Sequence, residues 1–83
     1  MFAVYVLYSV THTKIYIGFT SNFPARLASH NAEKGKGYTH PYRPWKVIHM
    51  EHFESKTEAL KREKQLKSAK GRDFIWKLIE ATG

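Results

Sequence analysis

The side chains best suited to chemistry in this sequence are two phenols, a guanidinium, an imidazole and a carboxylate. In chain order they are Tyr5, Tyr16, Arg26, His30 and Glu63. The tyrosines lie near the start of the chain, the arginine and histidine are four residues apart, and the glutamate comes far downstream. Groups of these types can activate water, stabilise charge that develops on a phosphate and hold a metal ion. The set therefore suits the cutting of a phosphodiester bond.

Two strands are expected to bring the phenols side by side. Residues 2–9 and 14–19 are rich in Val, Ile and Tyr, which favours strands, and the short polar segment 10–13 suits a hairpin connection. Gly18 lies near the end of the second strand, where glycine allows a positive φ or a close backbone approach. A third strand is expected over residues 45–53, which alternate apolar with polar for much of their length. The alternative for each strand tyrosine is a purely structural place in the sheet.

The first helix is expected to carry the guanidinium and the imidazole. Residues 20–22 offer N-cap side chains and Pro24 suits the first turn, which predicts a helix over residues 23–34. Because residues four apart share a helix face, Arg26 and His30 should lie together, facing inward or at a cleft rim. A shared anion would relieve their mutual repulsion, and an arginine fork matches a phosphate. The alternative is ordinary pairing with a carboxylate.

Two later helices are expected after the third strand. The capping box at residues 55–58 predicts a helix start, with the helix running to about Ala69 and ending at Gly71. Glu63 shares a face of this helix with apolar residues, and a final helix is expected over residues 73–81. The apolar neighbours of the glutamate are Ala59, Leu60 and Leu66. A buried carboxylate needs a cation, which could be a metal, an arginine or a lysine, and a plain salt bridge is the structural alternative.

The element order β-β-α-β-α-α predicts an α+β fold, with a small three-stranded antiparallel sheet flanked by helices. At 83 residues the chain is expected to form one domain spanning 1–83. It has no cysteine, which excludes disulfides and thiolate metal sites and suits a reducing, cytoplasmic location. It has no apolar run long enough to span a membrane and no apparent signal peptide.

The charge balance points to a polyanionic partner. The chain has 14 Lys and Arg against 7 Asp and Glu, giving a formal net charge of +7. A field of that sign attracts nucleic acid, while an anionic membrane surface is disfavoured because the basic helix lacks a bulky aromatic face. The loop at 34–40 mixes cations, glycines and a tyrosine, a composition that binds phosphates or simply forms an ordinary loop.

Taken in order, these residues resemble the GIY-YIG nuclease superfamily over nearly the whole chain. The closest resemblance is to small stand-alone members similar to the N-terminal nuclease domain of the bacterial excision-repair subunit. Residues 3–5 (Ala-Val-Tyr) stand at the first triplet, of which only Tyr5 remains, and residues 16–18 (Tyr-Ile-Gly) form the second in full. Residues 26–31 look like the helix of the family, and residues 58–67 look like its glutamate helix.

The resemblance implies a role for each candidate residue. Tyr16 would act as the general base or pass the proton of water onward, and Tyr5 would orient that water or a phosphate oxygen. Arg26 would stabilise charge on the phosphoryl group with help from His30. Glu63 would hold one divalent metal ion, Mg²⁺ or Mn²⁺, because hard oxygen ligands suit these ions. The residues expected to contact the nucleic acid are Gly18, Lys36, Tyr38 and His40.

The leading hypothesis is therefore a metal-dependent endonuclease that makes single-strand incisions in DNA, with DNA favoured over RNA and structure preferred over sequence. A protein partner could supply further specificity. The alternative hypothesis is a basic nucleic-acid-binding module without catalysis, which the charge alone would explain. Loss of the glycine and isoleucine from the first triplet leaves that alternative open.

Overall fold

A computed structural model describes residues 1–31 and 42–82 of the chain. Its sheet consists of β1 (Phe2–Ser9), β2 (Lys14–Thr20) and β3 (Lys46–Phe53). Both neighbouring pairs are antiparallel and the strand order is β2-β1-β3, so β1 is central and β2 lies at an edge. The expected three-stranded antiparallel sheet is confirmed, with each strand within about one residue of its predicted bounds.

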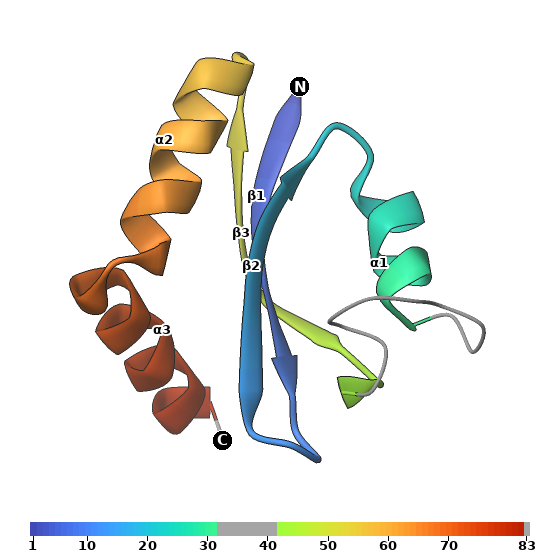
Figure 1. The fold of residues 1–83 in the computed structure, drawn as a ribbon, viewed down its shortest axis with the longest axis vertical. Coiled ribbons are helices and arrows are strands. Elements are labelled where there is room, and N and C mark those ends of the chain that lie inside the picture. The colour runs from blue at the N-terminus through green and yellow to red at the C-terminus, as the bar shows by residue number, and fades with distance from the viewer. Residues whose placement is uncertain (32–41, 83) are drawn as a thin grey trace.

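Helices cover both faces of this sheet (Figure 1). Helix α1 (Phe23–Asn31) lies on one face, while α2 (Lys56–Lys67) and α3 (Ala69–Thr82) lie on the other. The order β-β-α-β-α-α confirms the predicted α+β fold. None of the helices in the described part is long and apolar enough to cross a membrane.

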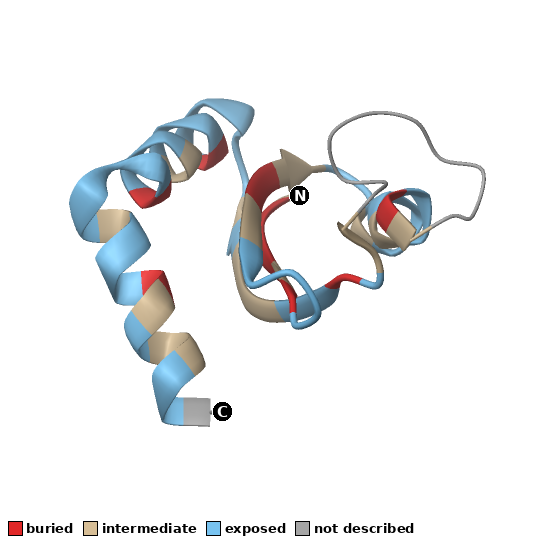
Figure 2. Ribbon diagram, turned by 60° about the horizontal axis from the view of Figure 1, so that its bottom comes forward, coloured by how far each residue is buried: buried red, intermediate tan, exposed pale blue. Residues whose placement is uncertain are grey.

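The alternation of side chains along the strands separates the buried residues into two clusters. The cluster beneath α2 and α3 contains Val4, Val6, Ile17, Ala59, Leu66 and Ile75. The cluster beneath α1 contains Tyr5, Leu7 and Trp45, with Tyr16, Phe23, Leu27 and Tyr42 packed against it. Figure 2 shows buried residues along the strands and on the sides of the helices nearest the sheet. The aromatic cluster under α1 therefore contains both phenols of the candidate site.

Ion pairing fixes α2 against β3. Arg62 Nε donates to Glu51 Oε1 at 2.9 Å, and the His49 ring meets the other carboxylate oxygen at 2.7 Å. Burial alone would raise the pKa of Glu51, but hydrogen bonds from Arg62 and His49 outweigh it and lower that pKa. The contact between Arg62 and Glu51 thus anchors α2, the helix that carries Glu63, to β3.

The junction between α2 and α3 differs from the prediction. The capping box is present, since the Ser55 hydroxyl accepts from the Glu58 amide at 3.1 Å, but α2 ends at Lys67 with Ser68 as its C-cap. Gly71 was expected to end a helix and instead lies in the first turn of α3. A side chain there would meet backbone atoms at the end of α2, so this glycine permits close helix approach.

Replacing Gly71 with alanine is expected to destabilise the protein by about 1–3 kcal/mol. A methyl group at this position would lie 2.5 Å from the Leu66 Cα and carbonyl oxygen and would also meet the Gln65 carbonyl. Helix propensity alone predicts the opposite sign, a gain of about 1 kcal/mol. Urea unfolding of Gly71→Ala beside the exposed Lys70→Ala measures the effect. A more stable Gly71→Ala variant would contradict the close packing.

Candidate active site

Tyr5 lies at the centre of the candidate site. It pairs with Gly18 across β1 and β2, and its side chain is completely buried. A Cβ atom on Gly18 would lie 2.7 Å from the Tyr5 hydroxyl oxygen and 3.0 Å from the Tyr16 ring. The second triplet thus ends in glycine because the Tyr5 ring occupies the space above it. Of the two roles expected for this glycine, the close approach is the one that the structure shows.

His30 is the hydrogen-bond partner of the buried phenol. Its Nε2 lies 3.0 Å from the Tyr5 hydroxyl, and the residue is 7% exposed. Burial, followed by the nearby charge of Arg26, lowers the pKa of His30. The imidazole is therefore neutral at pH 7, so one of its ring nitrogens is a hydrogen-bond donor and the other an acceptor.

Arg26 lies beside the two phenols. Interaction with Tyr5 is the largest influence that raises the pKa of Arg26, and interaction with Tyr16 adds to the rise. A guanidinium can only donate, so any hydrogen bond between Arg26 and a phenol is accepted by the phenol oxygen. Arg26 is exposed at the surface while Tyr5 is buried. The Arg26 guanidinium therefore places a positive charge at the surface, above the buried Tyr5.

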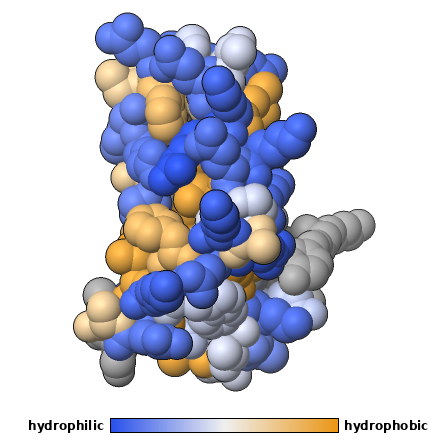
Figure 3. All heavy atoms as spheres, turned by 90° about the vertical axis from the view of Figure 1, so that its left-hand side faces the viewer, coloured by the Kyte–Doolittle hydropathy of each residue, from blue (hydrophilic) through white to orange (hydrophobic). Residues whose placement is uncertain are grey.

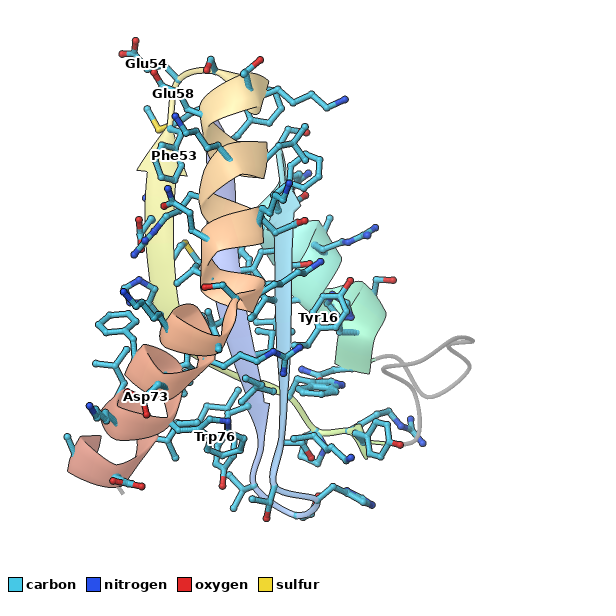
Figure 4. All side chains as sticks on the ribbon, turned by 60° about the vertical axis from the view of Figure 1, so that its left-hand side comes forward. Tyr16, Phe53, Glu54, Glu58, Asp73 and Trp76 are labelled. Carbon is cyan, nitrogen blue, oxygen red and sulfur yellow. The ribbon has the colours of Figure 1, made fainter. Side chains whose placement is uncertain are left out.

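The two phenols differ in environment. Burial raises the pKa of Tyr5, the charge of Tyr16 adds to this rise, and hydrogen bonding to Arg26 opposes it. Tyr5 therefore keeps its proton at neutral pH. Tyr16 is only partly buried, with its ring 6.2 Å from that of Tyr5 and 4.7 Å from that of His30. Figure 4 shows Tyr16 on β2 at the side nearest α1.

Contacts at both ends of α1 position this helix over the sheet. The Asn22 side chain accepts from the Ala25 amide at 3.3 Å, as expected of an N-cap. At the other end, Asn31 Oδ1 accepts from the Trp45 amide at 2.6 Å and Nδ2 donates to the Trp45 carbonyl at 3.1 Å. The sequence does not predict this pair of hydrogen bonds between the Asn31 side chain and the Trp45 backbone. The one sequence feature that could have indicated these bonds is the position of Asn31 at the end of the helix, directly after His30.

Glu63 reaches the same neighbourhood from the opposite helix layer. Its negative charge is among the influences that raise the pKa of Tyr5, although the two residues lie on different elements. The side chain is 17% exposed, and Oε1 lies 3.3 Å from Lys67 Nζ. Ala59 and Leu66 share its inward face as predicted, but Leu60 is 40% exposed and lies outside that face. The apolar stripe of α2 is narrower than the sequence pattern indicates.

Four of the five candidate groups therefore form one connected cluster, and Glu63 lies within electrostatic reach of it. Gly18 is buried and packs against that cluster. The remaining predicted contacts with nucleic acid, Lys36, Tyr38 and His40, lie outside the described residues. Their roles stay predictions.

Comparison with known proteins assigns the chain to a family. Residues 1–78 match the family model described as the GIY-YIG catalytic domain. The chain belongs to the GIY-YIG family. This membership agrees with the resemblance of the two tyrosine strands and the glutamate helix, and it indicates a nuclease-type phosphodiesterase role.

Relatives of this GIY-YIG protein include UPF0213 proteins of Staphylococcus haemolyticus and Natronomonas pharaonis. The first is 46% identical over 54 residues, which span 65% of this chain and 66%, just under two thirds, of the relative. The second is 42% identical over 65 residues, covering 78% of this chain and 75% of the relative. The solution NMR structure of a UPF0213 protein from Bacillus halodurans is 28% identical, with a TM-score of 0.55, and the match covers 94% of this chain and 85% of that one.

GIY-YIG nucleases generally use a divalent metal ion, and Glu63 is the carboxylate for which the sequence predicts that role. Residues 1–31 and 42–82 contain no group of three or more His, Cys, Asp or Glu side chains suited to a metal. These described residues therefore do not supply a full set of protein ligands. Mg²⁺ does not need one, because it commonly binds one carboxylate, several waters and substrate phosphate oxygens. An i,i+4 pair such as that of Glu63 with Lys67 is worth only about 0.3–0.5 kcal/mol, so a divalent ion can displace the ammonium.

Acidification is expected to weaken the GIY-YIG fold through His30. Its pKa is lowered on folding, so the unfolded chain binds more protons and stability falls as pH drops below about 6.5. The loss is at most about 1.4 kcal/mol per pH unit and stops below the folded-state pKa. Urea titrations at pH 7.5, 6.0 and 5.0 should show a steeper decline for the wild type than for His30→Gln. Parallel declines would contradict a buried neutral imidazole.

Proposed function

We propose that this protein is a metal-dependent endonuclease that hydrolyses phosphodiester bonds in DNA by single-strand incision. The observation that carries the proposal is the position of Arg26, which is exposed and interacts electrostatically with both phenols. A preorganised positive charge of this kind stabilises the charge that develops on a phosphate during hydrolysis. Family membership supports the reaction class.

The two phenols have separate tasks in this proposal. Tyr16 is the one that reaches the surface, so it is placed to take the proton of the attacking water or pass it onward. Tyr5 is completely buried and keeps its proton, so it acts as a positioning residue. Its hydroxyl is hydrogen-bonded to His30 and interacts with Arg26, so it would help to position the guanidinium. This assigns Tyr5 a less direct role than the sequence suggests, since a buried hydroxyl does not contact the substrate.

Glu63 would hold the divalent ion, Mg²⁺ or Mn²⁺. Such an ion, when bound, polarises phosphate oxygens and stabilises charge on the leaving group. Arg26 and Glu63 belong to different helix layers, so the scissile phosphate would lie between them, beside Tyr16 at the edge strand. A net charge of +7 favours a polyanionic substrate and speeds its encounter. We infer a preference for DNA structure over sequence, with any further specificity supplied by a protein partner, and a cytoplasmic location.

Cleavage of defined DNA substrates tests the function. The protein is incubated at low salt with plain, nicked and branched duplexes carrying one labelled strand, in Mg²⁺, in Mn²⁺ or in EDTA. The expected result is incision of one strand in either metal, none in EDTA, and different rates among the three structures. Salt-sensitive DNA binding without cleavage in any metal would contradict the proposal and favour the non-catalytic binding module.

A further inference from the structure

A second cationic site borders the cluster of Tyr5, Tyr16, Arg26 and His30. A pocket of about 320 Å³ lies at β2 and the α2–α3 junction. Its lining residues are Ile15, Tyr16, Ile17, Lys67 and Arg72. Tyr16 thus belongs both to this pocket and to the group of side chains around Arg26. Because β2 is an edge strand, the pocket lies beside a strand edge, which presents backbone donors and acceptors.

The two cations in the pocket have few competing partners. Arg72 Nε donates to the Lys67 carbonyl at 3.3 Å, which holds the guanidinium beside the end of α2. Within residues 1–31 and 42–82, no carboxylate forms an ion pair with Arg72. Lys67 pairs with Glu63 at 3.3 Å, but its side chain remains 50% exposed. Two positive groups on a concave surface next to a half-buried phenol create a site that favours an anion.

The surrounding surface suits a strand that continues past the site. Figure 3 shows that hydrophilic side chains dominate the face formed by α2 and α3, with apolar side chains between them. The pocket is open and, at about 320 Å³, is large enough for a hydrated phosphate. A nucleic-acid strand that places one phosphate beside Tyr16 and Arg26 would bring a neighbouring phosphate to this pocket.

We propose that Lys67 and Arg72 bind a backbone phosphate of the substrate DNA strand, adjacent to the phosphate that is cut. The position of this phosphate next to the cleaved one rests on the proposed function. Phosphate binding by Lys67 and Arg72 does not depend on catalysis. The strand thereby runs across the outer edge of β2 from α1 toward the α2–α3 junction. Contacts of this type position the strand without reading its sequence.

Binding and cleavage by Lys67→Met and Arg72→Met, singly and together, test the inference. Anisotropy of a labelled single-stranded oligonucleotide is measured in EDTA at several salt concentrations, so that cleavage does not interfere. The double variant is expected to bind about tenfold more weakly, since hydrogen bonds to charged groups are the strong ones. The slope of log K against log salt should fall by about 1.4, or about 0.7 per cation. In cleavage, KM should rise while kcat changes little.

Matched controls carry the same loss of charge at other places on the same helices. Lys61→Met on α2 and Lys77→Met on α3 remove exposed cations that do not line the pocket. They should lower affinity less than the pocket variants, and circular dichroism should show all variants folded. Equal effects of pocket and control variants would mean that only overall charge matters and would overturn the inference.

The remaining outcomes separate this inference from the proposed function. A fall in kcat with unchanged KM and salt slope would show that Lys67 acts through Glu63 and not on a phosphate, which overturns the inference. Wild-type cleavage with no effect of the double variant would overturn it while the nuclease proposal stands. Weaker, less salt-dependent binding by the double variant, with no cleavage by the wild type, would support the phosphate contact and contradict the nuclease proposal.

Discussion

Replacement of Arg26 with methionine is expected to reduce kcat/KM for DNA cleavage by about 10²–10³-fold. The guanidinium is the exposed charge beside both phenols, and methionine preserves much of its apolar length but no charge. Arg26→Lys should recover only part of the rate, because an ammonium group lacks the planar fork that matches a phosphate. Steady-state kinetics on a labelled duplex in Mg²⁺ gives the comparison.

The control for this variant is Lys46→Met, which removes an exposed charge on β3, the edge strand on the other side of β1 from Tyr16. It should change kcat by less than a few fold. Because Arg26 is exposed, the variant is expected to fold. Full activity in Arg26→Met, with the protein purified free of contaminating nucleases, would remove the arginine from the chemistry.

Replacement of Glu63 with glutamine is expected to lower cleavage by about 10²-fold or more. Glutamine has nearly the same size but a neutral amide, so it binds Mg²⁺ or Mn²⁺ far less well than a carboxylate does. Mn²⁺ binding is read separately by electron paramagnetic resonance of the free ion. We expect the bound fraction to fall in Glu63→Gln together with the cleavage rate.

Glu58→Gln is a matched control on the same helix. Glu58 lies at the start of α2, toward the end of the molecule far from Tyr16 in Figure 4, and its side chain is exposed. This variant should retain Mn²⁺ binding and cleavage. Retention of both properties by Glu63→Gln as well would place the metal at another residue.

The sequence predicts the sheet well because its signals are local and redundant. The strand patterns around Tyr5 and Tyr16 are rich in β-formers, and the capping box at Ser55 marks the helix start through one specific hydrogen bond. Gly71 was misread because glycine is a common helix terminator. Here its function is to let two helices approach, which depends on the tertiary arrangement and leaves no local trace.

In the candidate site, too, some features follow from local spacing and others depend on the tertiary fold. Spacing alone placed Arg26 beside His30, and the structure brings both to the phenols. It could not show that His30 would be 7% exposed or that Tyr5 would be fully buried, because both depend on how α1 packs over β1. Arg72 gave no signal because a cation on a basic helix looks like solvated surface. Only the fold places it beside Tyr16.

A crystal structure with Mn²⁺ and a short, uncleavable phosphorothioate oligonucleotide tests the central claim most directly. That claim is the convergence of Glu63 with Arg26 and Tyr16 on one phosphate. We predict an anomalous Mn²⁺ peak bonded to the Glu63 carboxylate and to a phosphate that also contacts the Arg26 guanidinium. A metal bound elsewhere, or a phosphate that contacts Arg26 while Glu63 stays paired with Lys67, would contradict it.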